Sequence, residues 1–113
     1  MMQSRKKDIQ RIIGLKRLDG LLITNIKNIR YLTGFTGSSG FAIITRDRCL
    51  FFTDFRYEEQ SKREVKGFEI AIEKGKRIKL IKSFVKKLGI KKLGFEKSIS
   101  YEFYELLKGV PAA

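Results

Sequence analysis

The chain has 113 residues, of which 42% are hydrophobic and 33% charged, and it contains one cysteine and no histidine. This length fits a single compact domain, and the apolar content is too high for general disorder. No apolar run approaches the roughly 20 residues of a membrane span, and no apolar signal segment follows the basic N-terminus. Because zinc sites need clustered Cys and His, and no histidine can activate a serine, we expect no metal or catalytic centre within this chain. The lone Cys49 suits a reducing cytoplasm, which is the expected location.

The net charge of +13 is distributed unevenly. Residues 1–18 hold six basic residues and one acidic residue, residues 74–97 hold ten and one, and residues 19–73 hold eight of each. Both basic segments have the pattern of amphipathic helices with solvated faces, which are common in thermophile proteins. The alternative is a stand-alone basic module that binds nucleic acid through residues 74–97. We favour solvation and expect neither nucleic acid nor a membrane as a partner.

In chain order, the first third of the sequence begins with a helix over residues 4–18, which Gly20 is expected to stop. A short strand follows over residues 21–24. Residues 25–33 are expected to form a connection that carries several apolar side chains. Residues 34–40, with three glycines and two serines, give the strongest loop signal in the chain.

Two apolar runs follow, over residues 41–45 and 49–53, and their short polar link predicts a β-hairpin. Both runs are apolar on both faces, so we expect a sheet that is covered on both sides. A helix over residues 54–65 begins at the cap Asp54. Then come a strand over 68–72, a helix over 77–88, a strand over 93–95 and a helix over 100–108, which begins at the cap Ser100. This order predicts one α/β domain over residues 1–109, built as a mixed sheet flanked by helices, with residues 110–113 starting an interdomain linker.

Three short motifs have both a structural and a functional interpretation. The loop over residues 34–40 lacks the Gly-Lys-Ser/Thr ending of a phosphate-binding loop, so it predicts a tight turn into a buried strand. Glu58 and Glu59 are adjacent on a helix and make a poor chelate. Arg56, just after the cap Asp54, is suited to recognise a carboxylate through two hydrogen bonds. The residues alone favour a salt bridge between Arg56 and Asp54.

Residues 28–40 (Asn-Ile-Arg-Tyr-Leu-Thr-Gly-Phe-Thr-Gly-Ser-Ser-Gly) and residues 53–57 (Thr-Asp-Phe-Arg-Tyr) resemble the N-terminal domain of Xaa-Pro aminopeptidases and prolidases, which are creatinase-like metallopeptidases. The resemblance implies a ribonuclease-H-like α/β fold. It also implies a following catalytic domain, absent here, in which two divalent metal ions (Mn, Co or Zn) activate a water molecule. On this view the chain is a truncated piece of a hydrolase and by itself hydrolyses nothing.

The same resemblance implies roles for individual residues. The domain is expected to mediate homo-oligomer contacts and to wall part of an active site, in its own subunit or a neighbouring one. Arg56 would approach a proline-containing peptide, Asp54 and Tyr57 would orient Arg56, and Tyr31 would line the same surface. Phe55 departs from the family pattern, because many relatives carry glycine at that position.

Overall fold

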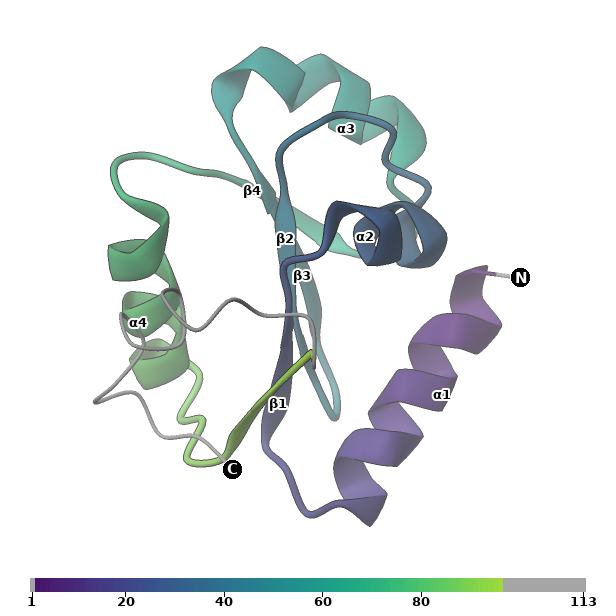
Figure 1. Cartoon of the computed structure of the whole chain (residues 1–113), viewed down its shortest axis with the longest axis vertical. Coiled ribbons are helices and arrows are strands. Elements are labelled where there is room, and N and C mark those ends of the chain that lie inside the picture. The colour runs from purple at the N-terminus through teal and green to yellow at the C-terminus, as the bar shows by residue number, and fades with distance from the viewer. Residues whose placement is uncertain (1, 97–113) are drawn as a thin grey trace.

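The computed structural model describes residues 2–96, which form one layered α/β unit (Figure 1). The helix expected over residues 100–108 and the linker expected from residue 110 lie outside the described residues. The elements in chain order are α1 (Met2–Leu15), β1 (Gly20–Ile23), α2 (Ile26–Thr33), β2 (Phe41–Thr45), β3 (Cys49–Thr53), the 3₁₀ turn η1 (Phe55–Tyr57), α3 (Glu58–Glu64), β4 (Glu69–Ile72), α4 (Arg77–Lys87) and β5 (Leu93–Phe95).

The strands form one five-stranded sheet in the order β4-β3-β2-β1-β5. The sequence predicts the mixed sheet but not this order. Strands β2 and β3 form the expected antiparallel hairpin, in which Phe41 lies opposite Phe52. Strand β2 is also antiparallel to β1, whereas β4 runs parallel to β3 and β5 runs parallel to β1. The carboxyl ends of β1, β3, β4 and β5 therefore meet at one edge of the sheet, called here the carboxyl edge, where β2 begins.

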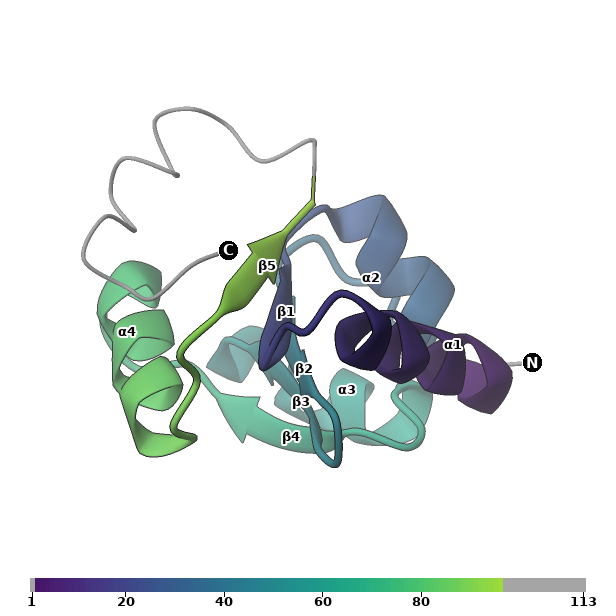
Figure 2. The ribbon, with the colours of Figure 1, turned by 90° about the horizontal axis from the view of Figure 1, so that it is seen from below.

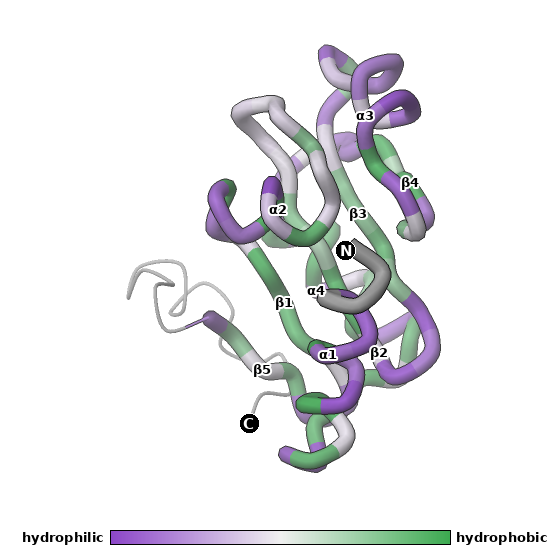
Figure 3. Tube along the Cα trace, turned by 90° about the vertical axis from the view of Figure 1, so that its right-hand side faces the viewer, coloured by the Kyte–Doolittle hydropathy of each residue, from purple (hydrophilic) through white to green (hydrophobic). Residues whose placement is uncertain are grey.

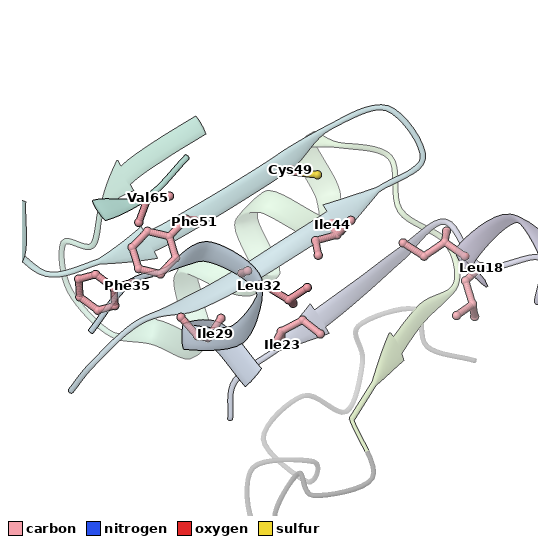
Figure 4. Close-up of a cluster of buried hydrophobic side chains, with 11 residues drawn as sticks. Leu18, Ile23, Ile29, Leu32, Phe35, Ile44, Cys49, Phe51 and Val65 are labelled. Atoms are coloured by element: carbon pink, nitrogen blue, oxygen red, sulfur yellow. The ribbon is translucent and has the colours of Figure 1, made fainter. Parts of the chain in front are cut away.

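Helices cover both faces of the sheet, with α1, α2 and α3 on one side and α4 on the other (Figures 1 and 2). Every residue of β2 and β3 is buried, which confirms the expected two-sided cover. The tube in Figure 3 shows this pattern as apolar central strands beside a polar α3. The cluster under α1 and α2 includes Phe35 and Phe51 (Figure 4), and the cluster under α4 includes Phe41 and Phe52. Each such buried ring contributes about 1.5–3 kcal/mol to the stability of the domain.

The segment over residues 25–33 corrects the sequence-based prediction, because most of it is the helix α2 rather than a connection. The side chain of Asn25 caps this helix and accepts hydrogen bonds from the backbone N–H of Lys27 (2.9 Å) and Asn28 (3.2 Å). Gly34 ends the helix in the left-handed region, with φ of 84°. Ile29 and Leu32 bury the inner face of α2, so tertiary packing stabilises a helix only eight residues long.

The first helix also ends earlier than expected, at Leu15 rather than residue 18. Arg17 takes the left-handed conformation, with φ of 57°, in the position that glycine usually occupies. The backbone N–H of Leu18 then donates to the Ile13 carbonyl at 2.9 Å. This pair of features is a Schellman-type helix end, and Gly20 instead begins strand β1.

Helix α4 carries much of the positive charge of the domain. It buries Ile81 and Val85 against the sheet, while Lys79, Lys82 and Lys86 are exposed. Lys76 stands at the N-cap of α4 and makes no capping hydrogen bond through its side chain. Within residues 2–96, no helix is long and apolar enough to cross a membrane.

Candidate functional site

Asp54 and Arg56 form a two-fold ion pair where β3 ends at the carboxyl edge. Asp54 Oδ1 accepts from the backbone N–H of Arg56 at 3.0 Å and thereby caps η1. The Arg56 guanidinium donates through Nε to Oδ1 at 3.0 Å and through Nη2 to Oδ2 at 2.9 Å. The guanidinium lowers the pKa of the Asp54 carboxyl below its ordinary value, mainly through these hydrogen bonds. The salt bridge that the residues alone favour is therefore present.

The ion pair with Asp54 leaves the Arg56 side chain exposed to solvent. The Arg56 side chain is 61% exposed, whereas that of Asp54 is 21% exposed. A guanidinium has five N–H groups, and the pair with Asp54 leaves Nη1 and one N–H of Nη2 outside the two bonds described above. Phe55, the residue between them, is 76% exposed. The carboxyl edge thus exposes two consecutive side chains, the apolar ring of Phe55 and the guanidinium of Arg56.

Tyr57 completes the cluster from the other end of η1. Its hydroxyl lies 2.6 Å from Ser38 Oγ, and the Ser38 backbone N–H points to the same oxygen at 3.4 Å. These bonds lower the pKa of the Tyr57 phenol. The Tyr57 ring meets Phe35 edge to face, with centroids 5.4 Å apart, and the Arg56 guanidinium carbon lies 5.3 Å from the Tyr57 ring centroid. Tyr57 therefore links the Arg56 pair to the Gly34–Gly40 loop.

The Gly34–Gly40 loop is fixed along its length. The Glu64 carboxylate accepts from the Thr36 backbone N–H at 2.8 Å and from its hydroxyl at 2.8 Å, which lowers the pKa of Glu64. A Cβ on Gly37 would lie only 2.3 Å from the Phe35 ring, so glycine is required by close approach. A Cβ on Gly40 would lie 2.9 Å from the Phe51 ring. The loop is thus held by hydrogen bonds and close ring contacts where it enters the buried strand β2.

Of the four residues expected at the site, the structure brings together Asp54, Arg56 and Tyr57. Tyr31 lies on α2, where it is 59% exposed. It lines a hollow of about 240 Å³, together with Asp8, Ile9, Ile23, Asn28 and Leu32. That lining includes none of the other three predicted residues.

Two residues near the carboxyl edge escaped the sequence analysis. Arg77, at the start of α4, donates to Ser39 Oγ in the Gly34–Gly40 loop at 3.0 Å. The Glu96 carboxylate, just after β5, accepts from the backbone N–H of Thr24 (2.6 Å) and Asn25 (3.0 Å) and fixes the start of α2. Both contacts join segments that are far apart in the chain, so no local sequence pattern predicts them.

The described residues do not fit a dinuclear metal site. Within residues 2–96, no three Cys, Asp or Glu side chains lie close enough to hold an ion together. Glu58 pairs instead with Lys62 at 3.5 Å. Cys49 is buried, and burial raises the pKa of its thiol, so it packs as the small apolar residue that its strand predicts.

These features define a class of protein: an α/β domain that presents a polar cluster at the carboxyl edge of a mixed sheet. Residues 5–112 match the family model described as the creatinase/prolidase N-terminal domain. The chain therefore belongs to the creatinase/prolidase N-terminal domain family, as its motifs predict. It is 48% identical over 97 residues to the uncharacterized peptidase YqhT of Bacillus subtilis, a match that covers 85% of this chain and 28% of that protein.

Solved structures agree with this assignment. The Xaa-Pro dipeptidase of Bacillus anthracis superposes with a TM-score of 0.86 at 38% identity, covering 97% of this chain and 32% of that one. The N-terminal domain of the cytoplasmic peptidase PepQ of Mycobacterium tuberculosis superposes with a TM-score of 0.83 at 30% identity, covering 95% of this chain and 84% of that one. The predicted fold class is thus confirmed, and the chain spans about a third or less of the complete peptidases that it matches here.

Proposed function

We propose that this chain is the accessory N-terminal domain of an Xaa-Pro peptidase, a cytoplasmic metallohydrolase whose catalytic domain follows in the same polypeptide. The observation that carries the proposal is the family match over residues 5–112, combined with a sequence that contains no histidine. The described residues also hold no cluster of metal ligands. Hydrolysis of the Xaa-Pro bond is therefore assigned to the other domain, and this domain contributes assembly and control of substrate access.

The substrate side of the domain is proposed to be the carboxyl edge around Asp54, Arg56 and Tyr57. Crevices outside the carboxyl ends of strands are the usual ligand sites of α/β sheets. Arg56 is exposed, always charged and held in one orientation by Asp54, so its remaining N–H groups are suited to a carbonyl or carboxylate oxygen of a peptide. Because Asp54 and Tyr57 hold this geometry before a ligand arrives, little conformational entropy is lost on binding.

This proposal is tested by kinetics on the enzyme made from the full coding sequence. Arg56→Met should raise KM for an Xaa-Pro peptide with a smaller change in kcat, because the lost contact binds substrate and transition state alike. The matched control is Arg63→Met, which removes an exposed arginine of α3. Equal kcat/KM for the Arg56→Met and wild-type enzymes, with both folded, would remove Arg56 from the substrate side.

The assembly role has a separate readout. The full-length enzyme is expected to be a homo-oligomer, so its sedimentation velocity should report a mass above that of one chain. If it sediments as a monomer at working concentration while it remains active, this domain controls access without mediating assembly.

A further inference from the structure

Arg77 belongs to α4, on the face of the sheet opposite α2 and α3, yet its side chain reaches the Gly34–Gly40 loop at the carboxyl edge. Nη2 donates to Ser39 Oγ at 3.0 Å, and Nε donates to Glu73 Oε1 at 2.9 Å. The guanidinium carbon lies 5.0 Å from the centroid of the Phe41 ring, which is fully buried. One side chain therefore joins the end of β4, the start of β2 and the loop before it.

The partners of Arg77 are themselves held in place. The Glu73 side chain is only 11% exposed, and its backbone N–H donates to the Thr53 carbonyl at the end of β3 at 2.6 Å. The Phe41 ring stacks on Phe52, with an interplanar angle of 6°. A planar fork that bonds two partners while it stacks on a ring is specific to arginine, because lysine offers a single point of charge. The Arg77 side chain is therefore anchored by partners that are themselves held in place.

A short chain of contacts connects Arg77 with the candidate site. The Ser39 carbonyl accepts from Thr53 Oγ1 at 2.6 Å, so the loop is held at Ser39 through both its backbone and its side chain. The preceding residue, Ser38, makes the bonds to the Tyr57 hydroxyl. Arg77 also adds to the lowering of the Asp54 pKa through its charge, behind the larger contribution of Arg56. Arg77 thus acts on both ends of the cluster without being part of it.

We propose that Arg77 is a positioning residue for the carboxyl edge. By holding Ser39, Arg77 fixes the position of the Gly34–Gly40 loop. Ser38 can then hydrogen-bond the Tyr57 hydroxyl, and the Tyr57 ring supports Arg56. The identification of that edge as the substrate side rests on the proposed function. The mechanical link from Arg77 to Tyr57 does not, and it is measurable on the 113-residue chain without any substrate.

The test uses Arg77→Met, Arg77→Lys and Ser39→Ala in that chain, with Arg63→Met as the matched control. NMR of ¹³C-labelled tyrosine, assigned through Tyr57→Phe, reports the titration of the Tyr57 phenol. Both Arg77 variants and Ser39→Ala should move this pKa upward, toward the ordinary tyrosine value, and should accelerate amide exchange at Ser38 roughly fivefold, the factor that corresponds to one lost net hydrogen bond. Arg77→Lys should fail to rescue, since it keeps the charge and loses the fork.

Pairing the substitutions separates positioning from general stability. In the Arg77→Met/Ser39→Ala double variant the Ser38 exchange rate should match that of either single variant, because both remove the same bond. If Arg77→Met lowers the melting temperature but leaves the Tyr57 titration and Ser38 exchange as in wild type, Arg77 contributes only to the stability of the fold and the proposal is overturned. If these readouts move while Arg56→Met leaves the kinetics of the full-length enzyme unchanged, the link stands and the substrate role of the edge falls.

Discussion

Adding one methyl group to the Gly34–Gly40 loop should displace the candidate site. In Gly37→Ala the new Cβ would lie 2.3 Å from Phe35 Cζ and 2.9 Å from Tyr57 Cδ1. Ordinary carbon contacts are about 3.5–4.0 Å, so one of the groups must move by about 1 Å or more. Phe35 is fully buried with its ring centroid 4.9 Å from that of Phe51, which leaves the loop and Tyr57 to yield. Overpacking of this kind costs about 1–3 kcal/mol.

The control for this substitution has the opposite expected sign. Gly14→Ala also adds a methyl group, in helix α1, where nothing lies within 4 Å of the new Cβ. Alanine there should stabilise the domain by about 0.5–1 kcal/mol, because glycine is the poorer helix former. Gly37 does not have a positive φ, so the two substitutions differ in available space rather than in backbone strain at the glycine.

Urea denaturation of the 113-residue chain measures both effects. With a slope of about 1–3 kcal/mol per molar urea, the Gly37→Ala midpoint should fall by roughly 1 M while the slope stays constant. The Tyr57 ring resonances should shift in the same variant and remain unchanged in Gly14→Ala. A Gly37→Ala free energy of unfolding within about 0.5 kcal/mol of wild type would refute the packing argument for the loop.

Three further predictions concern caps and carboxylates. Asp54→Ala should lower the free energy of unfolding by about 1 kcal/mol in denaturant unfolding. Asp54→Asn keeps a capping oxygen and should lower it clearly less. Equal losses of stability in the two variants would mean that the charge of Asp54 rather than its capping bond dominates. Lys76→Asp should raise the stability by about 1 kcal/mol, since the N-cap of α4 has no side-chain bond and an acid there suits the helix dipole; an unchanged melting temperature would contradict this. The pKa values of Asp54 and Glu64 are lowered by folding, so their stabilisation is present above the ordinary values of 3.8 and 4.5 and is lost as the pH falls through the lower folded values. Glu64→Gln should flatten this acid-side dependence, and an unaltered pH profile of the melting temperature would count against the Thr36 contact.

The parts of the fold that the sequence predicts well are those that depend on local pattern. The apolar runs over residues 41–45 and 49–53 identify two buried strands, and their three-residue link leaves little choice but a hairpin. Asp54 precedes a run of helix-forming residues, so its role as a cap follows from residue type and position. The Asp54–Arg56 pair is similarly local, since the two residues are two positions apart.

Helix α2 combines clear local signals with low intrinsic helix stability. Its signals are in the sequence: Asn25 at the cap, Ile26, Ile29 and Leu32 on one face, and Gly34 after the end. At eight residues with two β-branched isoleucines, the segment has little intrinsic helix stability, and burial against the sheet decides its conformation. The Arg77–Ser39 contact has no such signal, because the two residues lie 38 positions apart in the chain. Both the β2–β3 hairpin and the parallel pairing of β3 with β4 are needed to bring them together.

The most direct test of the account is a turnover assay that compares the purified 113-residue chain with the enzyme made from the full coding sequence. Both are incubated with Mn²⁺, Co²⁺ or Zn²⁺ and an Xaa-Pro dipeptide, and the release of free proline is followed. The account predicts proline release by the longer enzyme and none above the metal-containing buffer for the 113-residue chain. Release that rises in proportion to the concentration of the 113-residue chain, and that persists after repurification, would contradict the assignment of the chemistry to another domain.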